Sequence, residues 1–241
     1  MNVAYDTQPP ALTVRAAAGP VDLLACQTLR HRCFFGTGGC DSDAHDAVCD
    51  HLMIEQDGVL RATLRTLMVE NGRDLDRTLT AQSYDLSPLR DYPAPVLEIG
   101  RFCIGPGALD AHVMRLALGA LAGLVDRAGI GLMIGCTSLA GSDPARHAAA
   151  LAVLGRHHVG PDGMRPLRAA TTTVPLGGQV ADRRRAVASL PPLLRSYLGL
   201  GGWVSDHAVI DVAMDTVHVF TCVEVDRIPA ARASALRRLV V

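Results

Sequence analysis

The stretch VLEIGRFCI, from Val96 to Ile104, has the pattern of a buried strand that is interrupted at Gly100. A glycine inside such a pattern often marks a β-bulge or a close backbone approach. A Gly-Pro-Gly triplet ends the strand, and Asp110 is suited to cap a helix that runs to about Ala128. Apolar residues lie on nearly every face of this helix, so we expect it to be buried.

The rest of the chain alternates between strand and helix patterns. We expect further strands at 11–17, 51–55, 59–69, 131–136, 207–212 and 217–225, and further helices at 20–34, after 143–144, at 190–200 and near the C-terminus. Asp57 and Gly58 separate two of these strands and predict a tight hairpin. Residues 36–50 contain four Asp and three Gly without periodicity, which predicts a long loop. Because no repeat or clean linker divides the chain, we interpret residues 1–241 as one domain.

Composition argues against several classes of protein. The chain has 241 residues, with 23 basic and 24 acidic side chains and a net charge of −1. That balance, with only four Tyr, four Phe and one Trp, argues against a nucleic-acid-binding protein. Seven scattered cysteines favour a reducing compartment over a disulfide framework. The N-terminus has no secretory signal pattern and no apolar run is long enough to span a bilayer, so we expect a cytoplasmic protein.

Five stretches resemble the ornithine acyl-[acyl-carrier-protein] N-acyltransferase family, a GNAT-related group that makes lyso-ornithine lipid. They are CDHL (49–52), YDLSPL (84–89), EIGRFCI (98–104), IGCTSLAGSDP (134–144) and LPPLLRSYLGLGGWVSDHAVID (190–211). The resemblance implies a GNAT-like α/β domain with a mixed, mainly antiparallel sheet flanked by helices. It also implies transfer of a 3-hydroxyacyl group from acyl carrier protein to the α-amine of L-ornithine.

The first half of the chain is also similar to the acyl-homoserine-lactone synthases, and that similarity implies a set of site residues. They are Arg30, Phe34, Asp43, Asp46 and Arg65, which would bind substrate, and Glu98 and Arg101, which would be catalytic. A synthase of this kind is one alternative function and would need S-adenosylmethionine in the amine site. A catalytically silent module that binds acyl carrier protein or lipid is another. The 190–211 stretch favours the ornithine family.

Glu98 and Arg101 lie three residues apart on the expected strand, which in a regular strand means opposite faces. One extra residue in a bulge would bring both to the same side. Such a pair could hold a water that takes the proton of the amine, while a backbone N–H stabilises the thioester oxyanion. The alternative is a structural ion pair on a sheet face.

The loop at 41–50 is densely acidic, and carboxylates near the site would suit the two ammonium groups of ornithine. A solvated loop is the competing interpretation. Asp50 opens an apolar strand, so we expect it to be buried in the site, next to an arginine. Four possible zinc ligands in this region have spacings that match no common zinc site, so we expect no metal; they are Cys40, His45, Cys49 and His51.

We infer the acyl donor from a phosphate-binding motif that this sequence lacks. Many GNAT enzymes bind the pyrophosphate of acetyl-CoA with an Arg/Gln-x-x-Gly-x-Gly/Ala loop at a helix N-terminus. The corresponding residues here, Gly105 to Met114, lack that spacing and include Asp110, which would repel phosphate. This argues against CoA and for an acyl carrier protein thioester, with no separate cofactor.

Basic residues gather in the second half of the chain, most densely at Arg183, Arg184 and Arg185. Acyl carrier proteins are acidic, so this triplet is our candidate for the docking surface. Two other interpretations are peripheral contact with an anionic membrane at its inner face and simple solvation of the surface.

Overall fold

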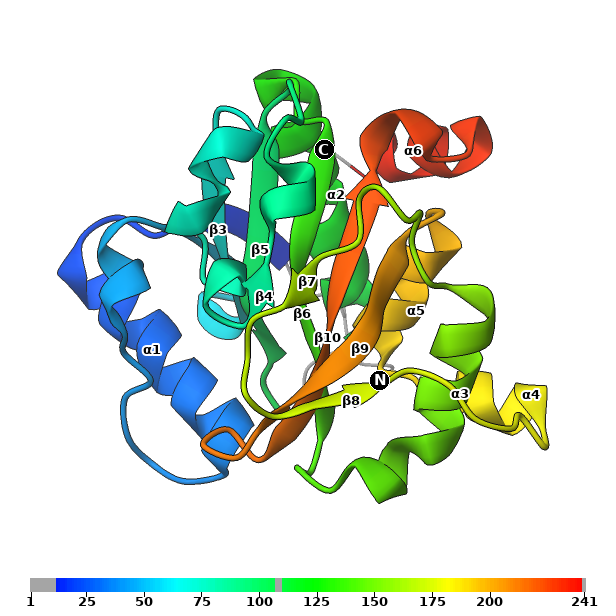
Figure 1. The fold of residues 1–241 in the computed structure, drawn as a ribbon. Helices are drawn as coiled ribbons and strands as arrows, with labels where there is room; N and C mark the ends of the chain where they lie inside the picture. Colours follow the sequence, from blue (N-terminus) through cyan, green and yellow to red (C-terminus); the bar gives the residue numbers. More distant parts are fainter. Residues whose placement is uncertain (1–11, 107–109, 240–241) are drawn as a thin grey trace, which may run out of the picture.

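A computed structural model describes residues 12–106 and 110–239 of this chain. Eight strands form one sheet in the order β1-β2-β3-β5-β6-β10-β9-β8 (Figure 1). Their bounds are β1 Leu12–Ala16, β2 Asp50–Gln56, β3 Val59–Val69, β5 Val96–Ile104, β6 Leu132–Ala140, β8 Thr173–Pro175, β9 Trp203–Asp211 and β10 Thr216–Glu224. Within this sheet, β5 and β6 are parallel and every other neighbouring pair is antiparallel. The expected mixed, mainly antiparallel sheet with flanking helices is confirmed.

Helices and turns cover both faces of the sheet (Figure 1). The helices are α1 Pro20–Phe35, α2 Asp110–Ala128, α3 Ala148–His157, α4 Arg183–Ala188, α5 Pro192–Gly199 and α6 Ala230–Arg237. One face packs against α2 and α5 over β2, β3 and β5, and against α3 to α5 over β9 and β10. The other face packs against short 3-10 turns, namely η2 Gly72–Arg77, η3 Thr80–Gln82 and η4 Ser87–Leu89, with the small β4 (Tyr84–Asp85) and β7 (Leu167–Arg168) pair.

Local sequence signals explain several of these elements. In the β2–β3 hairpin, Asp57 and Gly58 have φ values of 51° and 75°, the positive values that a tight two-residue turn requires. Asp143 accepts a hydrogen bond from the backbone N–H of Ala145 at 3.0 Å and caps the turn that leads into α3. The predicted capping by Asp110 depends on residues 107–109 and lies outside the described residues.

Strands β5 and β6 pair only over three residues and then separate. Val96 to Glu98 pair with Leu132 to Ile134. Along the remaining six residues of each strand, β5 and β6 no longer pair with each other. At the point of separation, a Cβ on Gly135 would lie 2.2 Å from the carbonyl oxygen of Ile99. Only glycine permits that approach, so Gly135 fixes where the two strands diverge.

A bulge in β5 shapes the same region. Arg65 pairs with Gly100 and Thr63 pairs with Cys103, so Arg101 and Phe102 together lie opposite one residue of β3. Arg101 has a φ of 52°, in the left-handed region that non-glycine residues rarely adopt. The predicted position of the bulge, Gly100, is therefore wrong by one residue: Gly100 pairs in register with Arg65, and the bulge begins at Arg101.

Other sequence-based expectations need correction. The long loop at 36–50 contains a 3-10 turn, η1 Ala44–Ala47, and its last residue already belongs to β2. Strand β6 extends four residues beyond the expected end at 136, and β9 begins at Trp203 instead of 207. The short elements β4, β7, β8 and α4 were not expected. None of the described helices is both long and apolar enough to cross a membrane.

We expect Gly135→Ala to lower the free energy of unfolding by about 2 kcal/mol, because the added methyl group meets backbone atoms that cannot yield without separating the strands. Urea denaturation measures this loss. Gly100→Ala is the matched control on the neighbouring strand, since a Cβ there has nothing within 4 Å. Equal stability of the two variants would contradict the role given to Gly135.

Candidate active site

The separated strands β5 and β6 open a cleft with a volume of about 730 Å³. Because it passes between two strands, side chains from both faces of the sheet line it. Its polar side includes Thr80, Glu98, Arg101, Cys136, Ser138, Asp211 and His218. Its apolar side belongs to the cluster under α2 and α5 and includes Ile99, Phe102, Ile104, Met133, Leu193, Tyr197 and Val223. The cleft therefore joins a polar chamber to an apolar surface across the sheet.

Glu98 lies on β5 where the pairing with β6 ends, and the residue is 5% exposed. Its carboxylate accepts hydrogen bonds from the backbone N–H of Leu79 at 3.0 Å and from the backbone N–H and hydroxyl of Thr80 at 2.7 and 2.6 Å. These donors hold the carboxylate in one orientation at the cleft wall. A fixed, negatively charged acceptor suits a group that must position a water or an amine.

Arg101 lies in the bulge and lines the cleft. Its guanidinium donates to Asp43 Oδ2 at 3.2 Å, lies 3.6 Å from Asp41 Oδ2 and contacts Met214 Sδ at 3.5 Å. It also lies over the Phe34 ring, 5.9 Å from the centroid. Among the described residues no contact joins Arg101 to Glu98, so the alternative of a structural ion pair between them is wrong.

Behind Arg101, the acidic loop is held by two deeply buried arginines, Arg30 and Arg65. Arg30 is 1% exposed and binds Asp41 at 2.8 Å and both oxygens of Asp46 at 2.9 Å. Arg65 binds Asp43 at 2.6 Å and Asp46 at 2.8 Å. Paired and hydrogen-bonded charges of this kind are the form in which ions are tolerated inside a protein.

The loop takes this shape through a local capping arrangement. Asp43 accepts from the backbone N–H of His45 at 2.8 Å, and Asp46 Oδ2 accepts from the backbone N–H of Asp43 at 3.3 Å. Burial opposes the charged form of Asp46, but hydrogen bonds from Arg30, Gln27 and Arg65 outweigh it and hold the pKa of this carboxyl well below its usual range.

The cluster therefore has three carboxylates, Asp41, Asp43 and Asp46, opposite three guanidiniums, Arg30, Arg65 and Arg101. Its charges balance internally, so it acts as a scaffold for Arg101 and offers little free negative charge to an ammonium. The expectation of a solvated loop is wrong for Asp41 and Asp46, which are buried. The expected burial of Asp50 is also wrong, because that residue is exposed and lies outside the cleft.

Comparison with known proteins identifies the family. Residues 29–118 match the acetyltransferase (GNAT) domain family. Over 231 residues the chain is 31% identical to an L-ornithine N(alpha)-acyltransferase of Rhodobacter capsulatus, covering 88% of this chain and 89% of that protein. The chain belongs to the L-ornithine N(alpha)-acyltransferase family. A second relative of the same name, from Brucella abortus, is 30% identical over 242 residues. That alignment covers 90% of this chain and 86% of the relative.

Solved structures support the fold. This acyltransferase resembles the CoA-dependent acyl-homoserine lactone synthase BjaI with MTA at a TM-score of 0.50 and 13% identity, with 95% of this chain and 90% of that chain covered. At that identity the likeness concerns the arrangement of strands and helices alone.

Arg183, Arg184 and Arg185 lie on α4, away from the cleft lining, and all three are exposed. Asp182 caps this helix by accepting from the backbone N–H of Arg185 at 3.1 Å. The chain then reaches Pro191 and Pro192, which do line the cleft. The triplet thus lies a few residues upstream of the cleft wall, and its role in docking stays a prediction.

The acyltransferase has further site residues that its sequence did not single out. Thr80 and His218 lie outside every expected site, and Asp211 appeared only as the last residue of the 190–211 stretch. No sequence signal separates Asp41 from the other acidic residues of the loop, and only its contacts with Arg30 and Arg101 show that it belongs to the cluster. In the described part of the chain, no group of three His, Cys, Asp or Glu side chains is placed to hold a metal ion, and the absence of a metal stays a prediction.

We expect Arg65→Ala to lower the free energy of unfolding by about 3 kcal/mol, because it leaves Asp43 and Asp46 short of a partner in a buried site. Urea denaturation provides the measurement. Asp50→Ala, a change at the exposed end of the same loop, should stay within about 0.5 kcal/mol of the parent. If Arg65→Ala and Asp50→Ala had the same urea denaturation midpoint, the cluster would not stabilise the fold.

Proposed function

We propose that this protein transfers a 3-hydroxyacyl group from acyl carrier protein to the α-amine of L-ornithine and so forms lyso-ornithine lipid. The observation that carries the proposal is the cleft across the sheet, with Glu98 on its polar side and an apolar wall behind it. Membership of the L-ornithine N(alpha)-acyltransferase family supports the acceptor and the reaction class. The acyl group and the carrier come from the resemblance set out above.

The reaction forms an amide bond between the amine nitrogen and the thioester carbonyl carbon, and it breaks the carbon–sulfur bond. The α-ammonium first loses one proton to solvent and becomes the nucleophilic amine. As the amide bond forms, the nitrogen loses a second proton, which Glu98 takes through a water held in the polar chamber. Glu98 passes this proton to the leaving thiolate, which departs as the carrier thiol. Transfer is direct, so no covalent enzyme intermediate and no cofactor are needed.

Backbone groups of β5 suit the developing oxyanion. Beyond Glu98 this strand no longer pairs with β6, so the edge that faces the cleft carries N–H groups without a partner in β6. Such a preorganised donor stabilises a tetrahedral intermediate more than the flat thioester. The bulge at Arg101 and Phe102 lies on this part of the strand, and both residues line the cleft.

The apolar side of the cleft suits the acyl chain. Met133, Leu193 and Val223 line it next to the cluster under α2. Burial of hydrocarbon contributes about 0.8 kcal/mol for each methylene group, so a long chain gains substantial binding energy there.

The donor part of the proposal rests on charge and on the absent pyrophosphate loop. The exposed triplet on α4 would attract an acidic carrier, and it lies just upstream of the cleft-lining Pro191. The same triplet would suit peripheral contact with an anionic membrane, which is the second use that we propose for it. We place the protein in the cytoplasm, where a carrier thioester is available.

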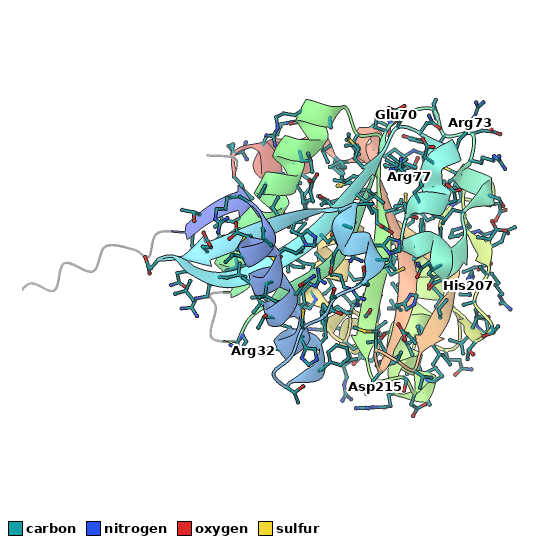
Figure 2. The ribbon with its side chains drawn as sticks, turned by 90° about the vertical axis from the view of Figure 1, so that its left-hand side faces the viewer. Arg32, Glu70, Arg73, Arg77, His207 and Asp215 are labelled. Carbon is teal, nitrogen blue, oxygen red and sulfur yellow. The ribbon has the colours of Figure 1, made fainter. Side chains whose placement is uncertain are left out.

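We expect Glu98→Gln to lower turnover of ornithine by roughly 10²-fold without unfolding the protein, because the amide cannot take the proton. Release of carrier thiol measures the rate. Glu70→Gln is the control: Glu70 is exposed at the end of β3 and lies at the upper edge of the molecule, outside the cleft (Figure 2). A folded Glu98→Gln variant with near-normal turnover would remove Glu98 from the chemistry.

Acyl carrier protein thioesters should outperform the matching acyl-CoA by roughly 10-fold or more in kcat/KM, and added salt should narrow that gap by screening the docking surface. Changing Arg183, Arg184 and Arg185 together to Ser should raise the KM for the carrier more than it lowers kcat. The control changes Arg73, Arg77 and Arg90 to Ser, three exposed arginines of the η2 to η4 region. Equal kcat/KM for both donors at every salt concentration would contradict the proposal that acyl carrier protein is the preferred acyl donor.

A further inference from the structure

The polar chamber contains a second carboxylate, Asp211, that the chemistry above does not use. Asp211 ends β9, lines the cleft and is half-buried. Its Oδ1 accepts one hydrogen bond, from the backbone N–H of Met214 at 3.1 Å. No arginine of the described chain forms an ion pair with it, whereas Asp41, Asp43 and Asp46 all have such partners. This point of the cleft therefore carries uncompensated negative charge.

His218 lies beside Asp211 and presents a hydrogen-bond acceptor. The Tyr84 hydroxyl donates its one hydrogen to the backbone carbonyl of His218 at 2.9 Å, so it can only accept from His218 Nδ1, which lies 3.4 Å away. This hydrogen-bond pattern assigns the proton of the neutral ring to Nδ1 and leaves the lone pair on Nε2. His218 is 6% exposed and lines the cleft, and among the described residues Nε2 has no hydrogen-bond partner.

The ring is neutral for a physical reason. Burial lowers the pKa of His218, and the opposing effect of the Asp211 charge is smaller. A neutral imidazole beside a carboxylate can accept from a cation, whereas a protonated one would already satisfy that carboxylate.

Strand register places these two residues on the face of the sheet that carries Glu98. Glu98 pairs with Ile134, whereas Ser138 pairs with His218 and Thr216 with Asp211. Alternate residues of a strand share a face, and each of these steps along β6 and β10 is even. Burial, aided by the charges of Glu98 and Asp211, raises the pKa of the Cys136 thiol to about 12, so both carboxylates act on the same part of the chamber.

We infer that Asp211 and His218 form a subsite for the side-chain ammonium of the acceptor amino acid, and so select an acceptor that carries a second amine. The inference rests on the proposed function, in which the α-amine lies near Glu98. Asp211 supplies the opposing charge, and His218 Nε2 accepts one N–H of the ammonium. The substrate's two ammonium groups then face Glu98 and Asp211, which have no arginine partner within the described ranges. Asp215, a third carboxylate of the cleft lining, already accepts two hydrogen bonds from Ser142.

The test compares two acceptors, L-ornithine and L-norvaline, which differ only in the terminal amine. With the full chain and one 3-hydroxyacyl carrier thioester, wild-type kcat/KM should favour ornithine. Asp211→Asn should reduce kcat/KM for ornithine roughly 10- to 100-fold, mainly through KM, and reduce kcat/KM for norvaline much less, because one charge-assisted contact to the side-chain ammonium is lost. The variant keeps an oxygen for the Met214 N–H, and an unchanged melting temperature verifies that it is folded.

Asp215→Asn is the matched control. Asp215 also lines the cleft, four residues away at the lower edge of the molecule where β9 and β10 meet (Figure 2), but its Oδ1 is already bound by the backbone N–H and hydroxyl of Ser142 at 2.9 and 2.7 Å. This variant should keep the wild-type preference. His218→Phe should lower kcat/KM for ornithine more than it lowers kcat/KM for norvaline.

Two results would overturn the subsite. Wild-type enzyme that acylates ornithine and norvaline equally well, or an Asp211→Asn variant with an unchanged preference, would reject it while leaving the proposed function intact. Wild-type enzyme that acylates neither amino acid with any thioester would instead overturn the proposed function, and the subsite with it.

Discussion

The short pairing of β5 with β6 is the constraint on which the site depends. Backbone N–H and C=O groups inside a protein normally have partners, and two adjacent parallel strands would supply them along their whole length. Here the pairing stops at Glu98 and Ile134, and Gly135 permits a backbone approach that any side chain would prevent. The strands beyond that point leave room for a ligand that supplies the missing contacts.

The bulge in β5 turns this opening into a chemical site. It places Arg101 in a left-handed conformation, which costs of order 1–3 kcal/mol for a non-glycine residue. The ion pairs of its side chain with Asp41 and Asp43 offset that cost, and the same carboxylates are held in turn by Arg30 and Arg65. The buried cluster thus fixes a strained backbone position in the cleft lining, and its own three carboxylates are all paired with arginines.

The sequence predicts the elements of this fold better than it predicts their contacts. Strand β5 and helix α2 begin and end at the predicted residues, because apolar patterning and the Gly-Pro-Gly triplet are local signals. The bulge falls on Arg101 and not on the glycine before it, since distant ion pairs override the local preference for glycine at a positive φ.

The acidic loop shows the same limit. Asp50 opens an apolar strand yet is exposed, because the face on which a strand's first residue lies depends on the register of its neighbours. Asp41 has no local signal for burial, and only its contact with Arg30 explains it. Thr80 reaches Glu98 from 18 residues away, a contact that no periodicity encodes. The resemblance, and not the residue pattern, brought Arg30, Arg65 and Arg101 together.

The contrast between paired and unpaired carboxylates bears on turnover as well as on specificity. In the proposed reaction the bound ornithine brings one ammonium group to Glu98 and one to Asp211, so each of these two carboxylates faces a cation before transfer. The product keeps the side-chain ammonium but has an uncharged amide in place of the α-amine. Once Glu98 has passed its proton on, it again lies buried without a cation beside it, and its hydrogen bonds from Leu79 and Thr80 are its remaining partners. Glu98 therefore favours binding of the free amino acid over binding of the amide, and the product is held in the cleft by its acyl chain and by its side-chain ammonium at Asp211.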